Sequence, residues 1–253
     1  MGKFLVIGHR GAAGYEPENT MSAFVKAIDM MVDAIEFDVR FSSDREVVVF
    51  HDPTLDRMTN GSGFVRNFVY HGELDRLNTG GGNTIPCLAK VLAVLGKGNL
   101  FRWKPCFNIE LKEVGMIDEV LRLVRVYHLV DSVVVSAFDT NENEKGDTSQ
   151  WVDLFVMKIR EPDLRIALLV ERAENFWRAL EITATYGIKA YAVNPSKDIV
   201  TKEMVTAAHA RGIKVFVWTV NEGHDIVRIK GMGADGAFSD YPDRIFVDGI
   251  QWV

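Results

Sequence analysis

Apolar and polar residues along this chain follow a strand-like pattern in some stretches and a helix-like pattern in others, and the two kinds of stretch alternate. Short apolar or alternating runs are typical of β-strands, whereas apolar residues that recur every three or four positions indicate an amphipathic helix. The predicted strand regions are 4–7, 34–50, 107–111, 133–136, 165–170, 190–193, 214–218 and 236–239. The predicted helices are 20–31, 88–95, 117–127, 175–186, 202–211 and 223–230.

Eight β regions with helices between them predict the α/β class with a parallel sheet. Region 34–50 counts once here, as a strand continued through a bulge or hairpin. Eight such units favour closure into a (β/α)8 TIM barrel, with an open doubly wound sheet as the alternative. The length of 253 residues suits a single barrel domain spanning 1–253.

Residues 53–85 are too many for an ordinary connection from strand to helix, and they are rich in Thr, Asn and Gly. They predict a small insertion after the second strand, and residues 139–149 predict a solvated loop. Thr201 and Asn221 are expected to cap the starts of helices, and Asn19 or, as the alternative, Thr20 is expected to cap the first helix. Helix ends are expected at the glycines 187, 212 and 231.

Composition and charge narrow the class of protein. The net charge of −6 gives no broadly basic surface for nucleic acid, so a nucleic-acid partner is not expected. Two cysteines, Cys87 and Cys106, are too few for a disulfide framework and match no zinc motif. The apolar N-terminal run is too short for a signal peptide or a membrane span. A cytoplasmic protein without stable membrane insertion is expected, and its oligomeric state is left open.

Charged residues stand where several predicted strands end. Glu36 and Asp38 share one face of their strand, and Glu110 shares a face with Lys112, because side chains alternate along a strand. A strand buried on both faces is normally apolar on both. The carboxyl ends of barrel strands form the rim that carries the active site in enzymes of this fold. The sequence therefore predicts that these side chains meet at the barrel mouth.

Three carboxylates that converge repel one another unless a cation joins them. Carboxylate oxygens prefer Mg²⁺ or Ca²⁺, whereas zinc would want His or Cys as well. Glu36, Asp38 and Glu110 are therefore the candidate ligands of one divalent cation. The alternative is an interior ion-pair network, for example Glu110 with Lys112 or Arg40.

Two histidines and two cations complete the candidate chemistry. His9 and His51 each follow an apolar strand and are candidates for general acid and base, since histidine titrates near neutrality. Arg10 and Lys112 are candidates for holding phosphate oxygens. A metal with two such cations suits phosphoryl transfer, which depends on positioning and charge neutralisation.

Four further residues have two interpretations each. Glu18 pairs with Arg10 or faces the metal site, and is a candidate for lining the pocket. Phe138 and Trp218 either line the pocket or fill the core. Asp240 faces the rim or, as the favoured interpretation, makes a turn.

With these motifs in place, the chain resembles the glycerophosphodiester phosphodiesterase family over nearly its whole length. The matching segments are His9-Arg10-Gly11, Pro17-Glu18-Asn19-Thr20, Glu36-Phe37-Asp38-Val39, Val49-Phe50-His51-Asp52-Pro53-Thr54-Leu55-Asp56-Arg57, Thr59-Asn60-Gly61-Ser62-Gly63, Glu110-Leu111-Lys112, Trp218-Thr219-Val220-Asn221 and Asp240-Tyr241-Pro242-Asp243. Segments 85–90 and 136–138 depart from the family pattern, which bears on the rim and on substrate preference.

The resemblance implies a (β/α)8 barrel with the 53–85 insertion that hydrolyses glycerophosphodiesters to glycerol 3-phosphate and an alcohol. It implies Glu36, Asp38 and Glu110 as metal ligands and His9 and His51 as acid and base. It likewise implies that Arg10 and Lys112 bind the phosphate. The sequence does not determine the alcohol, the metal ion or which histidine is the acid. It also does not decide between a route through a cyclic phosphate and direct attack by water.

Other functions remain as alternatives at this stage. A lysophospholipase D-like enzyme would use the same chemistry with a larger apolar approach to the mouth. A metal-dependent lyase or isomerase of enolase type is compatible with the fold, because fold does not determine function. A non-catalytic ligand-binding barrel is disfavoured, because binding alone does not require a pair of histidines.

Overall fold

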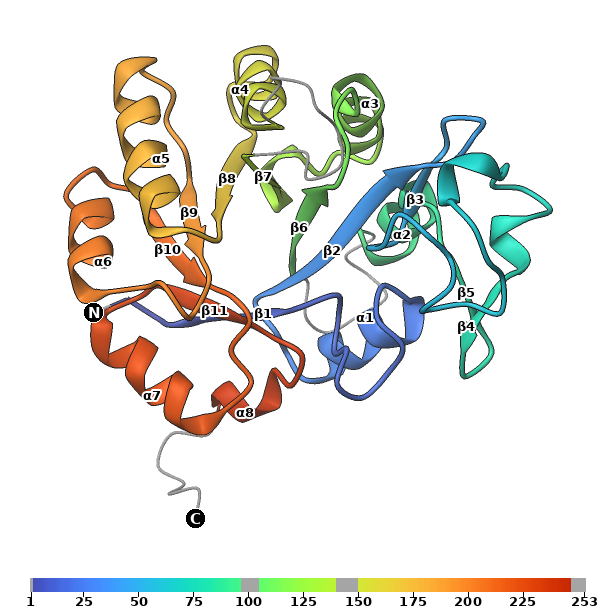
Figure 1. Cartoon of the computed structure of the whole chain (residues 1–253), viewed down its shortest axis with the longest axis horizontal. Coiled ribbons are helices and arrows are strands. Elements are labelled where there is room, and N and C mark those ends of the chain that lie inside the picture. The colour runs from blue at the N-terminus through green and yellow to red at the C-terminus, as the bar shows by residue number, and fades with distance from the viewer. Residues whose placement is uncertain (1, 97–104, 140–149, 247–253) are drawn as a thin grey trace.

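Residues 2–96, 105–139 and 150–246 are described by a computed structural model, and within them the chain forms a closed barrel of eight parallel strands (Figure 1). The strands are β1 (Leu5–Gly8), β2 (Ala34–Phe41), β6 (Cys106–Leu111), β7 (Val133–Phe138), β8 (Arg165–Val170), β9 (Ala192–Pro195), β10 (Lys214–Val217) and β11 (Gly236–Ser239). They pair in this order, and β11 pairs with β1 in parallel register, which closes the ring. The predicted (β/α)8 barrel is confirmed.

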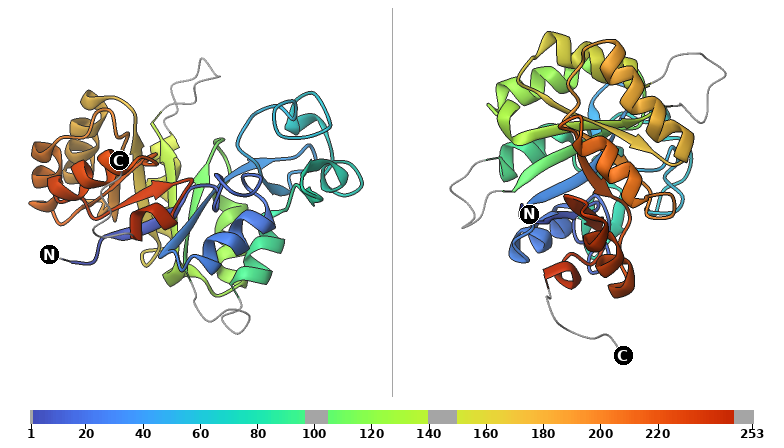
Figure 2. Two further views of the ribbon diagram at one scale, coloured as in Figure 1. Left: turned by 90° about the horizontal axis from the view of Figure 1, so that it is seen from below. Right: turned by 90° about the vertical axis from the view of Figure 1, so that its left-hand side faces the viewer.

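Helices surround the strands on the outside of the barrel (Figure 2). They are α1 (Met21–Asp29), α2 (Leu88–Leu95), α3 (Ile117–Val126), α4 (Gln150–Arg160), α5 (Ala173–Thr185), α6 (Lys202–His209), α7 (Gly223–Met232) and α8 (Asp243–Phe246). The predicted helices are present with small shifts of their ends, whereas α4 and α8 are additional. None of the helices in the described ranges has the length and apolarity that a membrane crossing requires. The predicted loop 139–149 lies, except for its first residue, outside the described residues.

Strand β2 shows how alternation builds the barrel wall. Ile35, Phe37 and Val39 are fully buried in the main core, which lies between the strands and the helices. Phe37 contacts a phenylalanine of α1 with ring centroids 5.4 Å apart. Glu36 and Asp38 occupy the other face and are nevertheless buried. The chain thus holds two carboxylates inside the barrel by burying the apolar face of the same strand.

The region predicted as one strand with a bulge or hairpin is a hairpin. Strand β3 (Val47–Val49) pairs antiparallel with the end of β2. Residues 53–85 then leave the barrel and contain the short antiparallel pair β4 (Asn78–Gly80) and β5 (Asn83–Thr84) (Figure 1). A small separate cluster packs them against the hairpin: Val48, Phe50, Leu55, Val65, Tyr70, Leu74 and Ile85. Apolar burial therefore anchors this segment to the barrel.

The predicted helix caps are partly wrong. Thr201 caps α6 as expected, because its side chain accepts from the backbone of Met204. The cap of α1 is Thr20, one of the two residues expected there, rather than the favoured Asn19, and α7 begins after Glu222 rather than Asn221. Both asparagines instead bind site carboxylates, so capping and site chemistry compete for the same residue type. The glycine at 231 lies within α7, whose end is Gly233 with φ of 86°.

Candidate active site

Three acidic side chains meet inside one end of the barrel. Asp38 on β2 and Glu110 on β6 are direct register partners, and Glu36 lies two residues before Asp38 on the same face. One ligand oxygen from each of the three lies within 4.8 Å of the others, and all three residues are buried. The convergence follows from strand pairing, because β2 and β6 run side by side in parallel.

The charges of these three carboxylates are balanced unequally. Burial alone would raise the pKa of Asp38, but the ammonium of Lys112 and the guanidinium of Arg10 outweigh burial and hold that pKa well below its usual range. Lys112 Nζ lies 3.0 Å from Asp38 Oδ1 and also contacts Glu110. Burial and the neighbouring Asp38 nevertheless raise the pKa of Glu110, although Lys112 opposes this. The interior ion-pair network considered from the sequence is therefore present.

That network leaves one carboxylate oxygen of Glu36 without a hydrogen-bond partner among the described residues. Its Oε2 accepts from the backbone N–H of Arg10 at 2.8 Å, but its buried Oε1 has no hydrogen-bond partner among the described residues. Burial and the charges of Asp38 and Glu110 raise the pKa of Glu36 well above its usual value. A buried carboxylate oxygen without a partner is costly. The unpartnered oxygen of Glu36 lies among the other carboxylates of the cluster, and a divalent cation with oxygen ligands fits this arrangement.

His9 directly follows β1 and forms the first of two imidazole arms. Its Nδ1 lies 2.7 Å from Asp240 Oδ1, just beyond β11, and donates to it because an ionised carboxylate only accepts. Asn221 Nδ2 donates to the other oxygen of Asp240 at 2.7 Å. Asn221 Oδ1 in turn accepts from the Asp240 backbone N–H and from the Ser239 hydroxyl. We call His9, Asp240 and Asn221 the His9 arm. The sequence favoured a turn role for Asp240, but its side chain binds His9 and Asn221 at the site.

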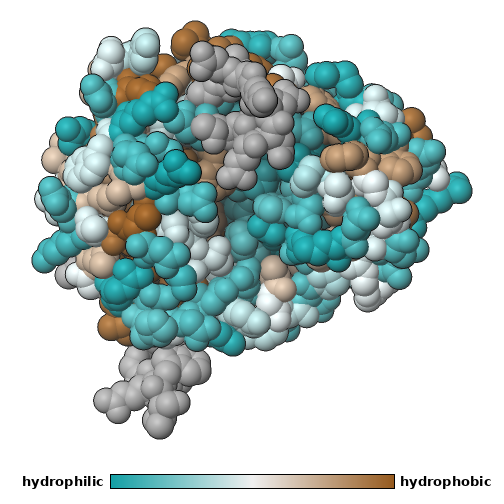
Figure 3. All heavy atoms as spheres, viewed as in Figure 1, coloured by the Kyte–Doolittle hydropathy of each residue, from teal (hydrophilic) through white to brown (hydrophobic). Residues whose placement is uncertain are grey.

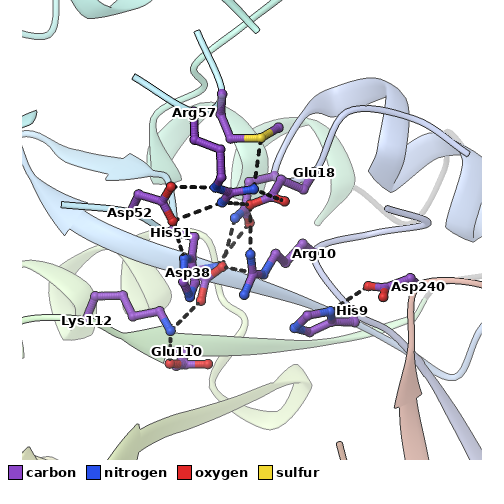
Figure 4. A network of polar contacts seen from close by, with 12 residues as sticks. His9, Arg10, Glu18, Asp38, His51, Asp52, Arg57, Glu110, Lys112 and Asp240 are labelled. Carbon is purple, nitrogen blue, oxygen red and sulfur yellow. Dashed lines mark hydrogen bonds and ion pairs between the residues drawn. The ribbon is translucent and has the colours of Figure 1, made fainter. Parts of the chain in front are cut away.

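His51 follows β3 and forms the second arm. Its Nδ1 lies 2.6 Å from Asp52 Oδ1, and Arg57 donates to both oxygens of Asp52 (Figure 4). Burial lowers the pKa of His51, and the cations Lys112 and Arg10 lower it further against the opposing charge of Asp38. We call His51, Asp52 and Arg57 the His51 arm.

Arg10 links the acidic cluster to its surroundings. It has φ of 52°, a conformation that costs a residue other than glycine roughly 1–3 kcal/mol. In this conformation its backbone N–H binds Glu36, and its Nε lies 3.3 Å from Asp38. Its Nη1 donates to Glu18 at 2.8 Å, so Glu18 pairs with Arg10 as one of its two interpretations expects. These ionic contacts offset the backbone strain.

A cavity of about 140 Å³ opens between these groups. Its charged side carries both imidazoles, Arg10, Lys112, Glu36 and Glu110, and its other side is largely apolar, with Phe138, Leu169, Trp218 and Phe238. The rings of Phe138 and Trp218 meet edge to face with centroids 5.5 Å apart. Both aromatic residues therefore line the cavity, whereas Glu18 lies behind Arg10. On the face shown in Figure 3 the molecule is hollowed near its centre, and hydrophilic residues gather there.

Several residues near the site have contacts there for which the sequence indicated no role. Asn19 lies in the left-handed region with φ of 59° and clasps Asp38, donating from Nδ2 at 2.8 Å and accepting the Asp38 N–H at 3.2 Å. Asn108 lines the cavity and donates to the hydroxyl of Ser136. Asp52 and Arg57 belong to the His51 arm. The signal for Asn108 was its position two residues before Glu110, on the same face of β6.

Comparison with known proteins gives consistent similarities. The model of the glycerophosphoryl diester phosphodiesterase family matches residues 9–244. The chain is 31% identical to the glycerophosphodiester phosphodiesterase of Caldanaerobacter subterraneus subsp. tengcongensis, over 96% of each sequence. It is 27% identical to a lysophospholipase D of Mus musculus, over 94% of this chain and 84% of that one. A solved phosphodiesterase of Oleispira antarctica, in complex with the product sn-glycerol-3-phosphate, matches with a TM-score of 0.78 and 25% identity, over 95% of this chain and 94% of that one.

Proposed function

The chain belongs to the glycerophosphoryl diester phosphodiesterase family, and from this premise we propose that it hydrolyses glycerophosphodiesters to glycerol 3-phosphate and an alcohol. One observation supports this proposal most directly. Two imidazoles, each held through Nδ1 by a carboxylate, line the same small cavity as an acidic cluster and two cations. The proposal places this activity in one catalytic domain that carries the 53–85 segment, acting on a small molecule in the cytoplasm.

Glu36, Asp38 and Glu110 would hold one divalent cation, Mg²⁺ or Ca²⁺. When bound, such an ion neutralises charge on the phosphate and lowers the pKa of a coordinated hydroxyl. The unpartnered Oε1 of Glu36 supports this assignment, because it is an available ligand already in position. Lys112 would share Asp38 and Glu110 with the ion and face the phosphate.

The two histidines would transfer the protons. His51 is suited to the base, because burial and nearby cations favour its neutral form. Its Nε2 would accept the proton of the attacking hydroxyl, either water or the glycerol hydroxyl, as the new P–O bond forms. His9, whose Nδ1 is bonded to Asp240, would donate from Nε2 to the leaving alcohol oxygen as the old P–O bond breaks. Along the glycerol route, water then opens the cyclic phosphate with the two proton transfers reversed.

Arg10 and Lys112 would position the phosphate. Both line the cavity beside the imidazoles, and both keep their charge, because neighbouring carboxylates outweigh the effect of burial and raise each pKa. A planar guanidinium can hold two phosphate oxygens, whereas an ammonium acts as a point charge.

The apolar side of the cavity supports a second candidate substrate. Phe138, Leu169, Trp218 and Phe238 could pack against an acyl chain, and one relative is a lysophospholipase D. Rates on glycerophosphocholine and on lysophosphatidylcholine decide between the two. We expect the deacylated substrate to be faster, because the described cavity is small.

The test of the proposed function is turnover of glycerophosphocholine, followed by enzymatic detection of glycerol 3-phosphate. We expect activity with Mg²⁺ or Ca²⁺, loss after dialysis against a chelator, and loss in Glu36→Gln. Glu113→Gln is the matched control, since Glu113 lies just beyond the neighbouring strand β6 but bonds Arg40 instead of joining the cluster. Full activity in chelator or in Glu36→Gln would contradict the metal assignment. A rearranged carbon skeleton in place of a phosphate monoester would indicate a lyase or isomerase.

A further inference from the structure

Arg57, in the 53–85 segment, reaches back to the active site (Figure 4). Its Nε and Nη2 donate to the two oxygens of Asp52, at 2.6 and 2.9 Å. Its Nη1 and Nη2 donate to the two oxygens of Glu18, at 2.9 and 2.7 Å, and Nη1 also lies 3.1 Å from Met58 Sδ. A guanidinium has five N–H groups. These five contacts use all of them, so Arg57 has no donor left for a phosphate.

Each carboxylate that Arg57 holds is bonded to a different group of the proposed machinery. Asp52 Oδ1 accepts from His51 Nδ1 at 2.6 Å. Glu18 Oε1 accepts from Arg10 Nη1 at 2.8 Å. A continuous chain of charge-assisted hydrogen bonds therefore runs from the imidazole to the guanidinium that lines the cavity, with Arg57 in the middle. Such bonds are shorter and stronger than neutral ones and fix orientation as well as distance.

Positive and negative groups alternate along this series of hydrogen bonds. Two guanidinium groups alternate with two carboxylates, and the hydrogen bonds of Arg57 lower the pKa of Asp52 to about 2. Burial would raise the pKa of Glu18, but Arg57 and Arg10 outweigh it and lower that pKa. Without Arg57, both carboxylates would lose a neutralising partner, and each would be free to adopt another rotamer.

Arg57 is not needed to attach the segment to the barrel. A buried apolar cluster already does so, with Val48 and Phe50 of the hairpin packed against Leu55, Val65 and Leu74. The Arg57 side chain is itself half-exposed, with a relative accessibility of 48%. A residue at the edge of a site, bonded to two site carboxylates, is better explained by their orientation than by burial.

We propose that Arg57 is a positioning residue that fixes His51 and Arg10 relative to each other, so that the 53–85 segment is part of the active site. The inference rests on the proposed function for its kinetic consequences and on geometry alone for the linkage. His51 acts on the proton of the attacking group, and Arg10 holds the phosphate. Arg57 therefore sets the alignment of nucleophile and phosphorus without contacting either.

The experiment compares Arg57→Ala with Arg66→Ala, Asp52→Asn and Glu18→Gln on glycerophosphocholine. Arg66 is the matched control, because it lies in the same segment and its guanidinium stacks on Phe64 at 5.2 Å. We expect Asp52→Asn to lower kcat, Glu18→Gln to raise KM, and Arg57→Ala to do both. The expected fall in kcat/KM for Arg57→Ala is roughly 10–100-fold, as is usual for outer partners of site residues. Arg66→Ala should match the wild type.

Two readouts separate positioning from a purely structural role. Guanidinium ion at millimolar concentration should partly restore Arg57→Ala, because the side chain it replaces is open to solvent, and Arg57→Lys should keep only part of the activity. The histidine ring ¹⁵N signals of His51 should shift in Arg57→Ala while those of His9 stay in place. Wild-type kcat and KM with a lower Tm in Arg57→Ala, or an unmoved His51 signal, would overturn the proposal.

Failure of the proposed function has a different signature. If the wild type does not cleave glycerophosphodiesters, the activity assignment fails. The ring signals and the melting temperatures of the same variants then still decide whether Arg57 orients His51.

Discussion

The two imidazoles of the site are alike at their first contact and different one step further out. His9 Nδ1 meets Asp240 at 2.7 Å, and His51 Nδ1 meets Asp52 at 2.6 Å. Behind Asp240 stands the neutral amide of Asn221, but behind Asp52 stands the guanidinium of Arg57. Besides its imidazole, Asp240 binds a neutral amide, whereas Asp52 forms an ion pair with a guanidinium.

This difference shows that two histidine–carboxylate pairs with the same hydrogen-bond geometry can have different electrostatic surroundings. In both arms a carboxylate fixes the ring and leaves Nε2 free to face the cavity. In the His9 arm the carboxylate is supported by a neutral amide, and this ring is the one proposed to donate a proton. In the His51 arm a guanidinium shares the carboxylate, and burial and nearby cations lower the pKa of the ring, which suits a group proposed to accept a proton.

The largest expected effect comes from changing the leaving group of the substrate, which tests whether His9 is the acid and His51 the base. His9→Ala and His51→Ala should each lower kcat on glycerophosphocholine by roughly 10²–10⁴-fold, the usual value of a positioned acid or base. With a p-nitrophenyl ester of glycerol phosphate, whose leaving group needs no proton, His9→Ala should recover most of its rate. His51→Ala should not recover. Equal recovery in both variants, or recovery in His51→Ala alone, would reverse or abolish the assignment.

Removal of the charge of each carboxylate should have unequal effects. We expect Asp240→Asn to lower kcat by roughly 10²-fold, because it removes the negative charge beside His9 and disturbs the tautomer. Asp52→Asn should cost about tenfold, since Arg57 already neutralises much of that charge. Steady-state kinetics of both variants, with circular dichroism as the control for folding, measure the difference. Equal losses would show that the two arms differ in composition but not in effect.

The pH dependence sharpens the comparison further. A base must be deprotonated, so activity should rise with pH through the pKa of His51, which burial and nearby cations place below the ordinary value of about 6.5. In Arg57→Ala the uncompensated Asp52 should favour the charged imidazole, and the acid limb of kcat/KM should move to higher pH. A profile of kcat/KM from acid to neutral pH tests the sign. An acid limb that does not move would mean that Arg57 does not influence the ionisation of His51.

The smallest expected effect concerns the neutral support of the His9 arm. Asn221→Ala removes the amide that holds Asp240 at 2.7 Å but leaves the carboxylate charge in place. We expect kcat to fall by less than about tenfold, with an unchanged acid limb in the pH profile. A shift of that limb comparable to the shift in Arg57→Ala would remove the distinction between neutral and cationic support.

Local pattern was sufficient to predict the barrel and the central acidic cluster. Alternation placed Glu36 and Asp38 on one face, and the expected pairing of parallel strands brought Glu110 beside them. The mouth of a barrel collects the ends of its strands, so His9 could be assigned to the same site before any distance was known. These inferences need only the period of the strand and the topology of the fold.

The supporting residues depend on contacts that no local pattern encodes. Asn19 and Asn221 precede helices, where asparagine is a normal cap, yet each side chain binds a carboxylate 19 residues further along the chain. The contact of His9 with Asp240 spans almost the entire sequence. The position of Arg57 depends on the path of the 53–85 segment, which its Gly-rich sequence leaves undetermined.

The pairing of β1 with β11 has a consequence for biosynthesis. His9 leaves the ribosome well before its carboxylate partner, which lies 231 residues further along the chain, and the two meet only when β11 pairs with β1. The other imidazole has both of its partners within six residues of itself in the sequence. A nascent chain can therefore assemble one of the two proposed proton-transfer groups early, while the other is completed only after β11 has been synthesised.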